Sequence, residues 1–117
     1  MEIKIPGVDA NSGLNLCDGD VNIYLDILRS YVSDMREALE KIQTVSEETL
    51  RDYAVRVHGI KSTSEAIGAE EARKTAKELE LMAKGGDLAG VLAKNSAFAE
   101  YLKNLVDGIQ AWLDRSI

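Results

Sequence analysis

Apolar residues recur every three or four positions over most of the chain, with charged and polar residues between them. The clearest run begins after Asp18-Gly19-Asp20, with spacings of 4, 3, 4, 4 and 3 between successive apolar positions: Tyr24, Leu28, Tyr31, Met35, Leu39 and Ile42. This spacing places one apolar stripe along a helix, because an α-helix completes a turn every ~3.6 residues. The pattern therefore predicts an amphipathic helix of about 24 residues in this segment.

Two further helices are predicted after this one, each with its own start and stop signals. Ser46 is a suitable N-cap, and the two glutamates that follow it would place negative charge in the first turn of a helix that runs to Ile67. Gly68 then occupies a position at which helices commonly end in a left-handed residue. The next helix is predicted over about 69–84, and it ends at Gly85-Gly86.

Both ends of the chain add a helix. Asp87 is predicted to cap the last one, whose apolar positions keep helical spacing: Leu88, Val91, Leu92, Phe98, Leu102, Leu105, Ile109 and Leu113. Residues 1–19 are interpreted as an arm with a short helix over about 9–16, which Asp9 or Asn11 could cap. Four amphipathic helices joined by short loops favour an antiparallel up-down-up-down bundle. We therefore expect a single all-α domain over 1–117, with the bundle at about 20–117 and the short N-terminal helix across one end.

Composition agrees with this fold and removes several classes of function. Ala, Leu, Glu, Lys and Arg supply 51 of the 117 residues, and Pro6 is the only proline, which favours uninterrupted helices. The formal net charge of −6 argues against a nucleic-acid partner, because contacts to phosphate need clustered lysine and arginine. One cysteine and one histidine cannot form an internal disulfide or a zinc site of four Cys/His ligands, so no metal site is expected.

The location of the protein is predicted from its apolar runs. No run approaches the ~20 residues of a membrane span, and the first ten residues lack the apolar centre of a signal peptide. We therefore expect a cytoplasmic monomer that does not insert into membranes, with Cys17 reduced.

The only histidine, His58, lies on the predicted third helix. On a helical wheel the core stripe of that helix is centred about 130° from His58 and contains these residues: Leu50, Tyr53, Val57, Ile60, Ser64 and Ile67. His58 is therefore expected on the solvent side, beside Lys61 and small side chains. An ordinary surface histidine is the simplest interpretation of this position, and an exposed imidazole nucleophile is the other.

Glu80 is the residue best placed to orient that imidazole. It lies twelve residues after Gly68, and His58 lies ten residues before it, so an antiparallel hairpin brings both to nearly the same height. Since Leu79 belongs to the core stripe, Glu80 is expected at the edge of the seam between the two helices. A carboxylate on Nδ1 would fix the tautomer and leave Nε2 with a free lone pair. The alternative is a solvated charge, one of 20 acidic residues.

Residues 57–69 have the sequence VHGIKSTSEAIGA, and the glutamate follows 22 positions after the histidine. This stretch resembles the histidine-containing phosphotransfer (HPt) domain family, which carries an aliphatic residue at +2, Lys at +3, a small residue at +4, Gly at +10 and Glu or Gln at +22. The matching residues are His58, Ile60, Lys61, Ser62, Gly68 and Glu80. The resemblance extends over essentially the whole chain and is most specific over 57–80. It departs from the commonest pattern at Ser62, where Gly is usual.

The resemblance implies a phosphoryl carrier rather than an enzyme, with no ATP-binding kinase domain. His58 would accept a phosphoryl group from the aspartate of one receiver domain and pass it to the aspartate of another. Lys61 would offset charge on the phosphoryl oxygens, and Glu80 would orient the imidazole. Ser62 would keep the approach to the histidine open, and Gly68 would permit the tight hairpin. Mg²⁺ would belong to the receiver, so no cofactor is implied for this chain.

The implied partners are response-regulator receiver domains, a hybrid sensor kinase, or both. They are expected to dock on an exposed patch around the histidine, with candidates on the third helix at Ala54, Val55, Ser62 and Glu65. Two other interpretations stay open. One is a bundle that binds a receiver without being phosphorylated and so sequesters or inhibits a response regulator. The other is a bundle whose histidine is incidental.

Overall fold

Five α-helices and no strand make up residues 2–116, the part of the chain that the computed structural model describes. The helices are α1 (Ala10–Leu16), α2 (Val21–Lys41), α3 (Leu50–Ile67), α4 (Glu70–Lys84) and α5 (Leu88–Ser116). Each helix falls within a few residues of its predicted range. The all-α class predicted from the spacing of apolar residues is therefore confirmed.

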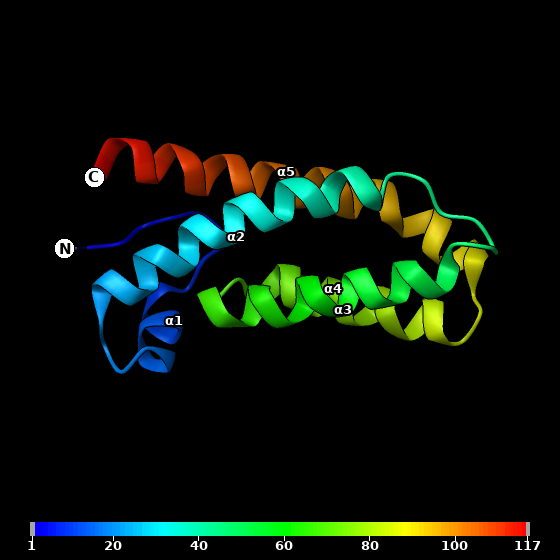
Figure 1. Ribbon diagram of the computed structural model, residues 1–117, viewed down its shortest axis with the longest axis horizontal. Helices are drawn as coiled ribbons and strands as arrows, with labels where there is room; N and C mark the ends of the chain where they lie inside the picture. The colour runs from blue at the N-terminus through cyan, green and yellow to red at the C-terminus, as the bar shows by residue number, and fades with distance from the viewer. Residues whose placement is uncertain (1, 117) are drawn as a thin grey trace.

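The four long helices form an elongated antiparallel bundle, and Figure 1 shows α2 and α5 side by side above α3 and α4. Each long helix contacts two neighbours, so that α2, α3, α4 and α5 close a ring around a shared core. The Cα atoms span 45 × 24 × 17 Å. The short α1 packs against α3 and α2 at the end of the bundle where both termini lie (Figure 1). The predicted up-down-up-down bundle with a helix across one end is confirmed.

Aspartate side chains cap three of the helices. At the start of α1 the Asp9 carboxylate accepts a hydrogen bond from the backbone N–H of Ser12 at 3.3 Å, so Asp9 rather than Asn11 is the cap. The Asp20 carboxylate accepts from the backbone N–H three residues later at 3.1 Å, and Asp87 does so at 2.8 Å. These bonds satisfy N–H groups that the first turn leaves without a helical partner.

The predicted start of the third helix is wrong by about one turn. Ser46 is not its N-cap, because α3 begins at Leu50 and the residues before it form a turn. The Thr49 hydroxyl accepts a hydrogen bond from the backbone N–H of Ser46 at 2.9 Å, which closes this turn locally. Hydroxyl side chains that bond to nearby backbone compete with helix formation, and here the turn is the result.

The apolar stripe predicted for α3 faces the core as expected. All six of its positions are buried: Leu50, Tyr53, Val57, Ile60, Ser64 and Ile67. Ser64, the polar member, shares a hydrogen bond of 2.9 Å with the hydroxyl of Tyr31 on α2. No buried side-chain nitrogen or oxygen in the described range lacks a hydrogen-bond partner. The core face of α3 is thus fully packed, which leaves the opposite face for other uses.

Asn95 ties three segments together at the far end of the bundle. Its amide donates a hydrogen bond to the backbone carbonyl of Ile42 at 2.7 Å and accepts one from the hydroxyl of Tyr53 at 2.7 Å. The side chain is buried, so both bonds form away from competing water. They connect α5 to the end of α2 and to the first turn of α3.

Gly68 sits where the α3–α4 turn touches the N-terminal segment. Its φ of 82° is left-handed, and it ends α3 as predicted. A Cβ at this position would lie 2.0 Å from the backbone oxygen of Asp9, and the Asp9 N–H donates to the Gly68 carbonyl at 2.8 Å. Glycine is therefore required both by the left-handed backbone conformation and by the close approach of the N-terminal segment at Asp9.

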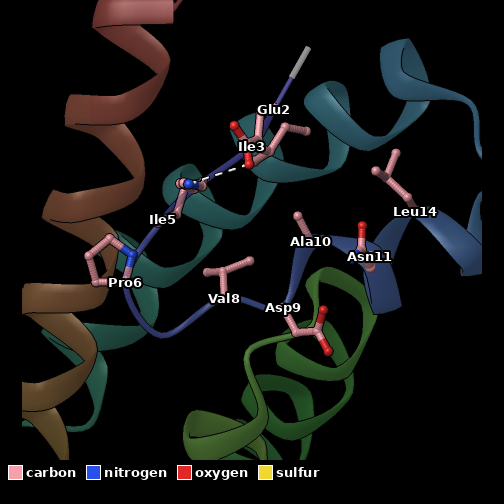
Figure 2. Close-up of a pocket in the computed structure, with 10 residues that line it drawn as sticks. Glu2, Ile3, Ile5, Pro6, Val8, Asp9, Ala10, Asn11 and Leu14 are labelled. Atoms are coloured by element: carbon pink, nitrogen blue, oxygen red, sulfur yellow. Dashed lines mark ion pairs between the residues drawn. The ribbon is translucent and has the colours of Figure 1, made fainter.

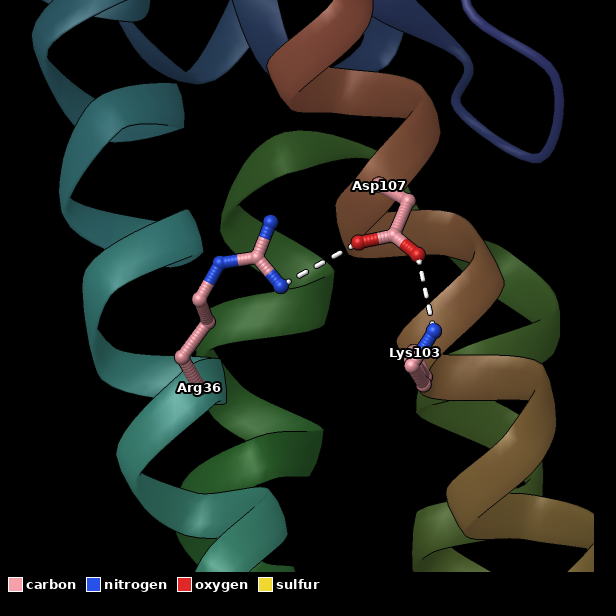
Figure 3. A network of polar contacts seen from close by, with 3 residues as sticks. All are labelled: Arg36, Lys103 and Asp107. Carbon is pink, nitrogen blue, oxygen red and sulfur yellow. Dashed lines mark hydrogen bonds and ion pairs between the residues drawn. The ribbon is translucent and has the colours of Figure 1, made fainter.

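A surface ion-pair network joins α2 to α5. Figure 3 shows the Asp107 carboxylate between Arg36, at 3.1 Å, and Lys103, at 3.2 Å. The hydrogen bonds from Lys103 and Arg36 lower the pKa of Asp107. All three side chains are exposed, so the network contributes to the pairing of α2 with α5 only weakly.

Candidate functional site

His58 projects from the middle of α3 on the side away from the core. Its side chain is 55% exposed, while its neighbour Val57 is fully buried. The wheel position predicted from the sequence is therefore confirmed. The imidazole is accessible to a second macromolecule, and the opposite face of its helix is packed in the core.

Glu80 of α4 contacts that imidazole directly. Its Oε2 lies 2.7 Å from Nδ1 of His58, and its side chain is only 4% exposed. The hairpin does bring the two residues level, as the counts on either side of Gly68 predicted. The alternative of a solvated surface charge is excluded, because this carboxylate is buried against α3.

Two lysines complete the environment of the Glu80 carboxylate. Lys61 of α3, which is partly buried, places its Nζ 3.0 Å from Oε1. Lys84, one turn further along α4 and exposed, places its Nζ 2.9 Å from Oε2. Lys84 was not predicted as a site residue, although a lysine four residues after a glutamate on one helix is the signal that could have found it.

These contacts keep Glu80 ionised. Burial by itself raises the pKa of this carboxyl group, but the hydrogen bonds from Lys84, from Lys61 and from the imidazole together lower the pKa to about 2. An ionised carboxylate only accepts hydrogen bonds, so the ring nitrogen that faces it must donate. Nδ1 of His58 therefore carries the proton in the neutral ring, and Nε2 is left with its lone pair.

The charge around the imidazole is positive overall. With a neutral ring, the cluster holds one carboxylate on Glu80 and the two ammonium groups of Lys61 and Lys84. A net positive charge beside an exposed, unprotonated nitrogen suits the approach of an anionic electrophile. The arrangement is that of a nucleophile with a fixed orientation.

The predicted docking residues differ in their exposure to solvent. Val55 is 69% exposed, and Ser62 and Glu65 are also exposed, so all three are available to a partner. The expectation of an exposed Ala54 is wrong, because that residue is buried at 6% exposure. The wheel assumed one narrow core stripe, but α3 packs against both α2 and α4 and so buries a wider arc. A helix with two long neighbours covers positions that lie about 90° from its core centre.

An open groove runs between α2 and α3 beside the histidine. Its lining includes Val55, Gly59 and Ile60 of α3, together with three residues of α2 that were not predicted to take part in docking: Asp34, Met35 and Ala38. Apart from the residues next to it in the chain and the nearby backbone of α3 itself, no atom lies within 4 Å of where a Cβ on Gly59 would stand. The surface next to the imidazole is therefore an open and partly apolar groove, with Met35 and Arg56 among the larger side chains that line it.

A second open pocket lies far from this site, under the N-terminal arm. Figure 2 shows it between the arm and α1, with Ile3, Val8 and Leu14 among the side chains that line it. None of the predicted site residues belongs to it. Within residues 2–116 no three His, Cys, Asp or Glu side chains come together as metal ligands. Over the same range no helix has the length and apolar character to cross a bilayer.

The fold and the site together define a class of protein: a four-helix bundle that presents one exposed imidazole, oriented by a buried carboxylate, to a docking surface. The family model of the Hpt domain matches residues 23–112, and the chain therefore belongs to the Hpt domain family. The comparisons with curated proteins and with solved structures gave no match.

Family membership gives the general function. Hpt domains carry out histidine phosphotransfer in phosphorelays, where they interact with receiver domains and kinases, and they are carriers of the phosphoryl group rather than kinase domains. The matched range includes all of α3 and α4, and so the whole cluster around His58. It omits α1 and the N-terminal arm, so their inclusion in one domain over 1–117 stays a prediction.

Proposed function

We propose that His58 accepts a phosphoryl group from the aspartyl phosphate of one receiver domain and passes it to the aspartate of a second. The contact of 2.7 Å between Nδ1 and the buried Glu80 carboxylate carries this proposal. This contact directs the proton of the neutral ring to Nδ1 and leaves the lone pair on Nε2. An ordinary surface histidine would not need a buried carboxylate for this purpose. The same bond holds the ring in a fixed orientation toward solvent.

The chemical step needs little more than this geometry. Nε2 attacks the phosphorus atom in line, the bond from phosphorus to the aspartate oxygen breaks, and the aspartate leaves as a carboxylate. Nδ1 of His58 keeps its proton, so the ring gains positive charge as the new bond forms, and Glu80 offsets that charge. Positioning and charge compensation are the main requirements of phosphoryl transfer. The Mg²⁺ ion that the reaction needs would be held by the receiver.

Lys61 has a second role in this proposal. Its ammonium group has three N–H donors, and the Glu80 contact at 3.0 Å occupies one of them. The others are free to approach the phosphoryl oxygens on Nε2, where a positive charge offsets the charge delivered by the donor. We therefore assign Lys61 both to holding Glu80 and to stabilising the phosphoryl group.

The docking surface is proposed to lie over α2 and α3 beside the imidazole. Exposed Val55 and the groove at Gly59 offer a partner apolar contact, Ser62 leaves room next to the ring, and Glu65 supplies a polar edge. A transient interface of this kind is small, because a relay must release each partner after transfer. Gly68 contributes indirectly, since it sets the hairpin that brings Glu80 to His58.

The test is transfer from a phosphorylated receiver domain to the native protein and to His58→Gln. We expect an acid-labile, base-stable phosphate on the native chain and none on the variant. Binding of the receiver is measured in parallel for both proteins. Unlabelled native protein that still binds the receiver would instead support the alternative, a bundle that sequesters a response regulator without being phosphorylated.

A further inference from the structure

Ser62 lies on the exposed face of α3, one turn after His58. Residues four positions apart on a helix are neighbours on its surface, with Cβ atoms roughly 5–6 Å apart. Helical side chains also lean toward the N-terminus of their helix, so the Ser62 side chain leans toward the turn that carries the histidine. The small size of this residue keeps the approach to the ring open, but serine also has a hydroxyl group that can donate a hydrogen bond.

The contact with Glu80 sets the direction in which Nε2 points. Nδ1 of His58 faces the Glu80 carboxylate of α4 at 2.7 Å, and Nε2 lies across the imidazole ring from Nδ1. Nε2 is therefore directed away from α4. On a helical wheel of α3, Lys61 lies about 60° from His58 on the α4 side, and Ser62 lies about 40° from His58 on the other side. A phosphoryl group on Nε2 would thus lie on the side of the ring where Ser62 lies.

The Ser62 hydroxyl is not engaged by the protein. Serine and threonine within helices often bond to the carbonyl one turn earlier, as Thr63 does with the carbonyl of Gly59 at 2.9 Å. Over residues 2–116 the Ser62 hydroxyl makes no such bond, and the residue is exposed. A hydrogen bond from this hydroxyl to a ligand would therefore break no bond within the protein.

Ser62 is also the neighbour of His58 with a suitable side chain on this side of α3. Val55 and Gly59, which line the groove beside the ring, have no side-chain donor. Arg56 lines the same groove, but it lies two positions before the histidine, and residues with that spacing do not face each other on a helix. The donor on the side away from α4 is therefore the serine.

We propose that the Ser62 hydroxyl donates a hydrogen bond to an oxygen of the phosphoryl group on Nε2 of His58. This inference rests on the proposed function, because it names a further group that contacts the phosphoryl group of that function. Lys61 contacts the phosphoryl oxygens from the α4 side and Ser62 contacts them from the other side. The group is thus held between a charged donor and a neutral one. Hydrogen bonds to ionised acceptors are stronger than those between neutral groups, and the phosphoryl group is anionic.

The test is the equilibrium of phosphoryl exchange between the protein and a receiver domain, measured for the native protein, Ser62→Ala and Ser62→Cys. The equilibrium constant between the free species does not depend on how tightly the two proteins dock. Loss of a hydrogen bond to the phosphoryl group should lower this constant for phosphoryl uptake about five- to tenfold in Ser62→Ala. Ser62→Cys, which keeps a side chain of similar size but is a weak donor, should lower it nearly as far.

Two features of the design separate the hydrogen bond from other roles of Ser62. Alanine is smaller than serine and the stronger helix former, so a residue that only left room beside the ring could be replaced by alanine without loss. Ser96→Ala is the matched control, because Ser96 is an exposed serine on α5, which contributes no side chain to the cluster around His58. An unchanged or raised equilibrium constant in Ser62→Ala, or an equal fall in Ser96→Ala, would overturn the proposal.

Phosphorus NMR of the phosphorylated proteins gives a second readout. The resonance of the phosphoryl group on His58 should shift in Ser62→Ala and stay in place in Ser96→Ala, and a resonance that does not move in Ser62→Ala would contradict the hydrogen bond. Absence of phosphate on the native protein would contradict the proposed function and this inference with it. A native protein that is phosphorylated to the same extent as Ser62→Ala would contradict the inference alone, so the two failures are distinguishable.

Discussion

Replacing Glu80 with glutamine should reduce the loss of folding stability, measured as the free energy of unfolding, that occurs as the pH falls. The substitution keeps the shape of the side chain and removes its charge, so Lys61 and Lys84 lose their ion-pair partner. In the native protein the pKa of Glu80 is about 2, compared with 4.5 for an ordinary glutamate. A depressed pKa means that the charged form stabilises the folded state above pH 4.5, and that this stabilisation disappears as the pH falls toward 2.

The size of the effect follows from that difference. The lowering of the Glu80 pKa from 4.5 to about 2 corresponds to about 3 kcal/mol in the free energy of unfolding. The free energy of unfolding should therefore be larger for the native protein than for Glu80→Gln at neutral pH. The gap should narrow by about 3 kcal/mol between about pH 5 and about pH 2.

Urea denaturation at a series of pH values measures this gap. The other carboxylates titrate in both proteins, so their contributions cancel in the difference. Glu78→Gln, a change at an exposed glutamate two residues earlier on α4, should leave a much flatter gap. A gap between the native protein and Glu80→Gln that stays constant from pH 7 to pH 2 would refute the conclusion that the buried carboxylate is held ionised by its neighbours.

Three other substitutions test separate parts of the site. Glu80→Ala should slow phosphotransfer roughly 10- to 100-fold without abolishing it, because Nε2 remains but the ring loses the partner that orients it; loss of the helical circular dichroism signal would show a structural role instead. Gly68→Ala should lower the free energy of unfolding by about 2–4 kcal/mol in urea titration, since its Cβ would meet the Asp9 carbonyl at 2.0 Å in a left-handed conformation; a change below about 0.5 kcal/mol would contradict this packing. Val55→Glu should weaken receiver binding in calorimetry while the melting temperature stays the same; unchanged affinity would remove Val55 from the docking surface.

The helices, and the contact between His58 and Glu80, were predictable because both depend on the periodicity of residues along single helices. The stripe from Leu50 to Ile67 fixes which face of α3 is buried, and this alone places His58 toward solvent. His58 lies ten residues before Gly68 and Glu80 lies twelve residues after it, which places Glu80 close to the height of the histidine. An antiparallel hairpin with a tight turn has no other register, so a long-range contact follows from sequence distance.

Other features depend on how the helices pack against one another, and the spacing of residues along a single helix does not determine this packing. Ala54 is buried because α3 has long neighbours on two sides, and the width of a buried arc depends on those neighbours. Ser46 belongs to a turn because the Thr49 hydroxyl accepts a hydrogen bond from the Ser46 backbone N–H, a local bond that competes with the start of a helix. Lys84 joins the cluster because the Glu80 side chain points toward α3. Lys84, four residues later on α4, then contacts Oε2, the same oxygen that contacts the imidazole.

In the proposed function, Nε2 of His58 carries the phosphoryl group. The most direct measurement is phosphorus–proton correlated NMR of the protein after incubation with a phosphorylated receiver domain. We expect one phosphorus resonance coupled to the ring protons of His58, the only imidazole, in the pattern of a phosphoryl group on Nε2 with Nδ1 still protonated. A phosphorus signal coupled to any other side chain, or to Nδ1, would contradict it.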